Sequence, residues 1–79
     1  MKTFKDITWN KQTGFGVVHF DNGLRMVVTI LEGGSRPIQG LIFPSDSDMV
    51  KDAEPFDFST PESLEHFMKL VQKREEVAA

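Results

Sequence analysis

The stretch GFGVVHFDNGLRMVVTIL, residues 14–31, decides the fold of this chain. Two runs rich in β-branched and aromatic residues flank Asn22 and Gly23. Asn-Gly is a strong hairpin signal, because both residues tolerate the positive φ that a type I′ turn requires. The pattern therefore predicts a β-hairpin with strands at 14–21 and 24–31.

A two-residue turn fixes the register of this hairpin and places apolar side chains on both of its faces. Asp21 would pair with Leu24, and Val18 with Val27. One face would then hold Phe15, Val17, His19, Leu24, Met26, Val28 and Ile30. The other face would hold Val18, Phe20, Val27 and Leu31, with Arg25 and Thr29 as its polar members. Because one helix covers only one face of a small sheet, we expect the second face to meet a partner protein, a second copy or the chain's own N-terminal segment.

The rest of the chain predicts two further strands, a loop and a helix. Residues 3–9 and 38–43 have the composition of strands, and residues 45–58 have the polar, acidic composition of a long exposed loop. Apolar residues at helical spacing predict a helix at 60–76. The sequence therefore predicts one α+β domain over residues 1–79, in which a four-stranded antiparallel meander is packed on one face by a C-terminal helix.

The helix start allows two interpretations. Ser59 fits a capping box, whereas Thr60 fits the cap of a helix whose first residue is Pro61. The apolar stripe of this helix consists of Leu64, Phe67, Met68 and Val71. We expect this stripe to cover the hairpin face that carries Phe15 and Val28.

Composition favours a soluble cytoplasmic protein. The chain has no cysteine, which fits a reducing compartment. No apolar run approaches the roughly 18 residues of a membrane span, and the first residues lack the apolar core of a signal peptide. Residues 1–44 carry five basic and three acidic side chains, whereas residues 45–79 carry four basic and nine acidic ones. This acidic balance argues against nucleic-acid binding.

No catalytic, cofactor or metal motif is present in the sequence. The acidic segment that begins at Asp46 does not match a calcium loop, because its sixth position is Lys51 where that loop needs glycine. His19 and His66 have no metal-ligand spacing, and neither has a positioned second group for acid–base chemistry. We therefore expect a binding protein and not an enzyme, without metal or cofactor.

Two groups of residues are candidates for partner binding. The first is the uncovered sheet face, where an arginine beside an aromatic side chain is typical of protein interfaces; it consists of Val18, Phe20, Arg25 and Val27. The second is the acidic loop, which would steer the chain toward a basic protein surface; it consists of Asp46, Asp48, Asp52 and Glu54.

Residues 9–20, with a tryptophan, a basic turn and a Gly-Phe-Gly strand, resemble the first ribonucleoprotein motif of cold-shock domains. That resemblance implies single-stranded nucleic-acid binding, in which Trp9, Phe15 and Phe20 stack on bases and Lys11 contacts phosphate. The next strand carries no aromatic residue, whereas cold-shock domains have a second aromatic motif there.

The layout of the chain also resembles small phage-encoded inhibitors, including an anti-CRISPR protein of type I-F. The resemblance lies in the hairpin turn at residues 21–23 and in the helix opening FDFSTPESLE at residues 56–65. It implies an inhibitor that occupies a surface of a bacterial host or defence complex, in the host cytoplasm.

Overall fold

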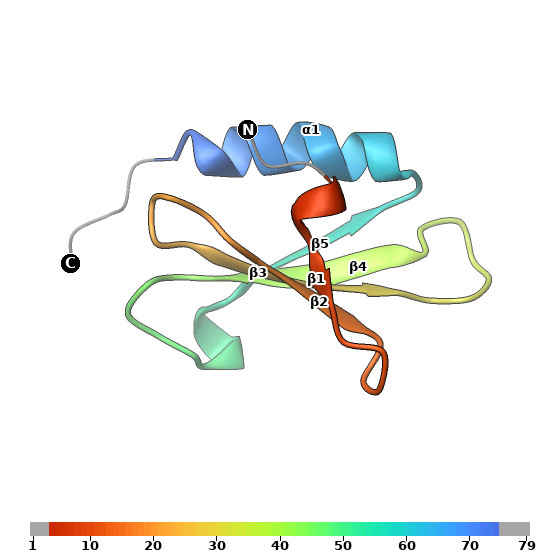
Figure 1. Cartoon of the computed structure of the whole chain (residues 1–79), viewed down its shortest axis with the longest axis horizontal. Helices are drawn as coiled ribbons and strands as arrows, with labels where there is room; N and C mark the ends of the chain where they lie inside the picture. The colour runs from red at the N-terminus through yellow and green to blue at the C-terminus, as the bar shows by residue number, and fades with distance from the viewer. Residues whose placement is uncertain (1–3, 75–79) are drawn as a thin grey trace.

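The computed structural model describes residues 4–74. These residues form one antiparallel sheet with strand order β1-β2-β3-β4-β5, and a single α-helix runs along one side of it (Figure 1). The elements, in chain order, are η1 (Phe4–Asp6), β1 (Thr8–Trp9), β2 (Phe15–His19), β3 (Arg25–Ile30), β4 (Ile38–Phe43), η2 (Val50–Asp52), β5 (Glu54–Phe58) and α1 (Pro61–Gln72). The predicted α+β class is confirmed, but the sheet has five strands and not four. None of the described helices combines the length and the apolar character that crossing a membrane requires.

The two differences from the predicted strands lie at the edges of the sheet. The predicted strand at 3–9 is reduced to the two residues of β1, because η1 precedes it. The last part of the predicted loop is β5, in which Phe56 and Phe58 alternate with Asp57 and other exposed residues. This alternation is typical of a strand with one buried face, so the prediction of a loop over the whole of 45–58 was wrong.

The hairpin forms, but in a different register from the one that Asn-Gly predicts. Among the described residues only glycines have positive φ, so Asn22 does not adopt the type I′ conformation. The Phe20 N–H instead donates to Leu24 O at 2.9 Å, and the Gly23 N–H donates to Phe20 O at 3.1 Å. The result is a three-residue loop that ends in Gly23 at φ 91°, the other common hairpin geometry.

The longer loop shifts the pairing by one residue, so that Val18 pairs with Met26 and Val17 with Val27. A shift of one residue moves every side chain of a strand to the opposite face. Val18 and Phe20 therefore lie in the core, with only 2% and 5% of their surfaces exposed. The prediction that these two residues belong to the uncovered face was wrong.

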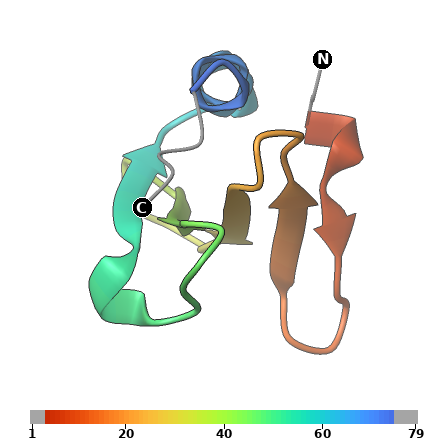
Figure 2. The ribbon, with the colours of Figure 1, turned by 90° about the vertical axis from the view of Figure 1, so that its left-hand side faces the viewer.

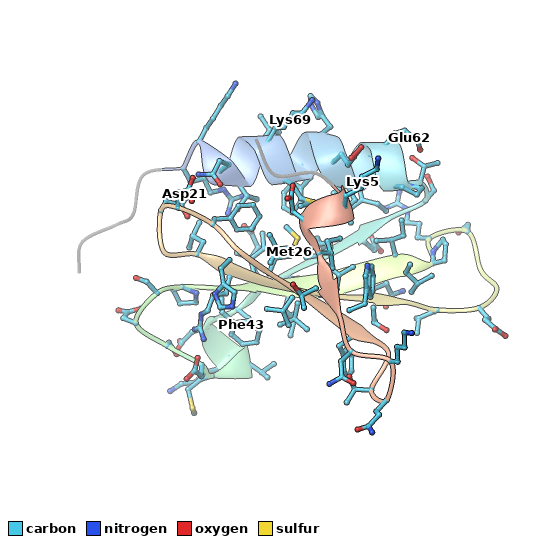
Figure 3. All side chains as sticks on the ribbon, viewed as in Figure 1. Lys5, Asp21, Met26, Phe43, Glu62 and Lys69 are labelled. Atoms are coloured by element: carbon cyan, nitrogen blue, oxygen red, sulfur yellow. The ribbon has the colours of Figure 1, made fainter. Side chains whose placement is uncertain are left out.

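The core lies between the sheet and α1, where Met26 is visible (Figure 3). The helix contributes the buried residues Leu64, Met68 and Val71, with Phe67 partly buried beside them, as the apolar stripe predicts. The strands and the segment before them contribute Ile7, Val18, Phe20, Met26, Val28, Ile38 and Ile42. Met26 and Val28 are thus in the core as predicted, whereas Phe15 and Ile30 are exposed.

Both ends of α1 have side-chain partners. Thr60 is the N-cap residue, because its Oγ1 accepts a hydrogen bond from the Ser63 N–H at 3.2 Å, and Pro61 is the first helical residue. At the other end, the Asn22 amide donates to Val71 O at 2.8 Å and to Arg74 O at 2.7 Å. The helix ends at Gln72 and not at 76; residues 75 and 76 lie outside the described part of the chain.

Candidate protein interface on the open sheet face

The side of the sheet away from α1, called the open face below, has no α-helix from residues 4–74 over it. The loop between β4 and η2, η2 itself and the turn between β1 and β2 extend on that side (Figures 1 and 2). Side chains of an uncovered sheet face are normally polar, because water is their alternative partner. An apolar open face therefore indicates a function.

A row of mostly apolar residues crosses the open face through all five strands. The row follows from the pairing of Thr8 with Val17, Val17 with Val27, Val27 with Leu41, and Leu41 with Pro55. Residues that pair directly project to the same side of the sheet. Met26 and Val28, the neighbours of Val27 on β3, are buried under α1. Side chains alternate between the two faces along a strand, so Val27 and its row lie on the open face. The three central residues, Val17, Val27 and Leu41, are only half-buried.

The rows on either side of this apolar row contain most of the polar groups. One consists of Phe15, Thr29, Gln39 and Asp57, and the other of His19, Arg25 and Phe43. An apolar centre with a mixed polar margin is the composition of protein–protein interfaces.

Part of the open face is hollowed to a volume of about 600 Å³. Phe15, which is 47% exposed, stands at the margin of this hollow. The residues that line it are Phe15, Val27, Thr29, Gln39, Gly40, Leu41, Pro55, Phe56 and Asp57. A hollow with these apolar walls can accept an aliphatic or aromatic side chain from a partner.

Arg25 fixes the loop at one end of the open face. Its guanidinium donates to Pro44 O at 3.0 Å and to Ser47 O at 2.7 Å, and it forms an ion pair with Asp48. The guanidinium carbon also lies 5.8 Å from the ring centre of Phe43, which projects away from α1 (Figure 3). Arg25 lies beside Phe43 and not beside Phe20, and it orders a loop that borders the open face.

The four predicted acidic residues are mostly engaged within the protein. Asp48 is paired with Arg25, Asp52 accepts a hydrogen bond from the Ser47 hydroxyl at 2.6 Å, and Glu54 lies 2.9 Å from Arg74. Asp46 is exposed. Beside these carboxylates, η2 and the residue before it present two apolar side chains to solvent: Met49 is 56% exposed and Val50 is 68% exposed.

The structure does not bring the four predicted nucleic-acid-binding residues together. Trp9 pairs with Gly16 on the α1 side of the sheet, Phe15 lies on the open face, and Phe20 is in the core. Lys11 is exposed in the turn between β1 and β2. No single surface therefore presents the three rings for base stacking.

The histidines and carboxylates of residues 4–74 do not gather into a metal site. No three His, Cys, Asp or Glu side chains within that range are close enough to hold an ion. His19 lies on β2 and His66 on α1.

Of the predicted interface residues, Arg25 and Val27 lie on the open face and Val18 and Phe20 do not. Sequence reasoning placed Val17 on the face under the helix, which was wrong because the predicted register is shifted by one residue. It missed Leu41 and Pro55, because it assigned no partner strand beyond 38–43. The signal that could have revealed them is the alternation around Phe56 and Phe58.

Comparisons with models of protein families, with curated proteins and with solved structures found no match to this chain.

Proposed function

We propose that this protein is a non-catalytic binding module whose open face docks on a protein partner. One observation carries the proposal: the apolar row through Val17, Val27 and Leu41 crosses the sheet on the side away from α1, and these three residues are only half-buried. Burying such a row against a partner contributes about 25 cal/mol for each Å² of apolar surface that leaves water, and this contribution offsets part of the entropic cost of association. The hollow beside the row offers a place for an anchoring side chain.

The surroundings of the open face favour a partner with basic residues at the margin of its own binding surface. Asp46 is exposed on the loop that Arg25 holds, and Asp48 and Asp52 lie on the same loop. Carboxylates at the edge of an interface steer encounter and determine which partners are accepted. The resemblance to type I-F anti-CRISPR inhibitors adds the proposal that the partner belongs to a bacterial host or defence complex.

A pair of variants on one strand tests the proposal. Val27→Lys places a charge in the centre of the open face, and Ile30→Lys makes the same type of change on the same strand at a residue that is already 50% exposed. Affinity purification from the source cells with quantitative mass spectrometry should recover a partner with the unchanged protein and with Ile30→Lys. Val27→Lys should lose it while circular dichroism shows an unchanged fold.

Two outcomes would contradict the proposal. Equal recovery with both variants would exclude the open face as the interface. Loss of the partner after nuclease treatment would show that the interaction passes through nucleic acid. Sedimentation velocity of the purified protein shows whether the partner is a second copy of this chain. Only self-association would raise the sedimentation coefficient as the concentration of the pure protein increases.

A further inference from the structure

A second hollow lies between α1 and β5, and it does not involve the open face. Its volume is about 530 Å³, and its walls are formed by Phe58, Glu62, Ser63, His66, Phe67 and Leu70. The ring centres of Phe58 and Phe67 are 5.1 Å apart, and Leu70 is 50% exposed. These three side chains form an apolar floor that is open to solvent. We call this hollow the helix–strand groove.

No strand of the described residues pairs with the outer edge of β5 beside this groove. β5 is last in the strand order, so only its inner edge is bonded to β4. Proline has no N–H and is accommodated in a strand where that position faces away from the ladder. The backbone groups of successive residues in a strand point to opposite edges of that strand. Asp57 is two residues after Pro55, so its N–H and C=O point to the free edge. The backbone groups of Phe56 and Phe58 point to β4. The free edge thus offers no N–H at Pro55, whereas Asp57, next to the groove, offers both an N–H and a C=O.

The groove also carries a carboxylate that forms no ion pair with another residue of the range 4–74. Glu62 lines it and has no ion-pair partner among the described residues, and it lies at the end of α1 where the chain enters from β5 (Figure 3). The two carboxylates on β5 are already paired, Glu54 with Arg74 and Asp57 with Arg36 at 3.0 Å. A ligand that contributes a cation would therefore meet Glu62 first.

We propose that the helix–strand groove binds an extended peptide that adds to the edge of β5, with an apolar side chain over Phe58 and Leu70 and a lysine or arginine at Glu62. Glu62 and Leu70 are eight residues apart on α1, which is about 12 Å along the helix axis. Side chains four residues apart in an extended peptide lie on the same face and about 13 Å from each other, so the apolar and the basic residue are separated by three positions. Strand addition of this kind derives affinity from main-chain hydrogen bonds and specificity from side-chain pockets. The proposal is independent of the open-face function, because the two surfaces lie on opposite sides of the sheet.

A displayed library of random peptides, selected on the full chain, tests this inference and at the same time defines the sequence of the ligand. The enriched sequences should share an aromatic or aliphatic residue with a basic residue four positions away. A synthetic peptide of that consensus should bind about tenfold more weakly to Leu70→Lys and to Glu62→Gln. Selection on Glu62→Gln should no longer enrich the basic residue, and this exposed variant keeps the test valid if Leu70→Lys does not fold.

Val27→Lys on the open face is the matched control and should bind the peptide normally. The inference is overturned if no sequence is enriched, if the consensus lacks the basic residue, or if neither groove variant weakens binding. It is also overturned if Val27→Lys alone removes binding, which would place the peptide on the open face. Self-association that disappears in Leu70→Lys would make a second copy the occupant and would likewise reject a peptide ligand.

Discussion

Asn22 connects two elements that are far apart in the sequence. Its Oδ1 accepts a hydrogen bond from the Leu24 N–H at 3.0 Å, which fixes the hairpin loop. Its amide group donates to Val71 O and Arg74 O at the end of α1. The last carbonyls of a helix lack their usual partner four residues further on. Val71 O also accepts a hydrogen bond from the Arg74 N–H at 3.0 Å, so the Asn22 amide adds a second donor there and supplies a partner for Arg74 O. Asn22 was predicted as a turn residue for its backbone, and the structure uses its side chain as well.

Replacing Asn22 by alanine should destabilise the protein by about 2 kcal/mol, because three hydrogen bonds are lost and each is worth about 0.5–1.5 kcal/mol. Urea denaturation followed by circular dichroism measures the change in the free energy of unfolding. Asp21→Ala, on the exposed neighbour in the same loop, is the control and should change that free energy by only a few tenths of a kcal/mol. Equal losses for the two variants would show that the Asn22 side chain contributes nothing specific.

The elements of this fold differ in how far the sequence determines them. The helix could be predicted because its cap at Thr60 and its apolar stripe are local signals. The existence of the hairpin was also predictable, but its register was not, because two-residue and three-residue loops both suit Asn-Gly and differ by one position. That single position exchanged the faces of β2 and carried Val18 and Phe20 from the candidate interface into the core. Arg25 and Val27 kept their predicted face.

Gly40 in the centre of the sheet has no room for a side chain, because the neighbouring strand and the Phe56 ring lie close to it. A Cβ atom there would overlap the carbonyl oxygen of Val27 and would lie 2.5 Å from the ring of Phe56. The carbonyl belongs to the paired neighbour strand β3, so it cannot move without disturbing the sheet. Gly34, by contrast, has φ 84° in a loop with no atom within 4 Å of an added Cβ.

Gly40→Ala should therefore cost about 2–3 kcal/mol of stability, which is the usual range for overpacking. Amide hydrogen exchange should accelerate along β3 and β4 in this variant. The control Gly34→Ala should cost about 1 kcal/mol, because only the strain of positive φ is added, and should leave exchange in the sheet unchanged. A Gly40→Ala protein as stable as Gly34→Ala would disprove the close contact.

The whole molecule presents two candidate binding surfaces on opposite sides of its sheet, and neither is basic. The chain carries 12 acidic and 9 basic residues, for a net charge of −3. Nucleic-acid binding depends chiefly on cations that neutralise phosphates. The aromatic residues that the cold-shock resemblance implies are divided among the α1 side, the open face and the core. Charge and geometry thus favour a protein or peptide ligand on both surfaces.

A fluorescently labelled oligothymidine should consequently show a dissociation constant above about 100 µM at 150 mM salt, since few phosphates can be neutralised and no stacking surface is formed. Fluorescence anisotropy measures this constant, and the emission of Trp9, the single tryptophan, gives an independent signal because a stacked base would quench it. Micromolar binding that is lost in Phe15→Ala would contradict the expectation, because it would require the open face to stack bases with one ring. Micromolar binding that is lost only in Lys11→Ala would instead place the contact at the turn between β1 and β2. It would contradict the expectation that this chain neutralises too few phosphates to bind.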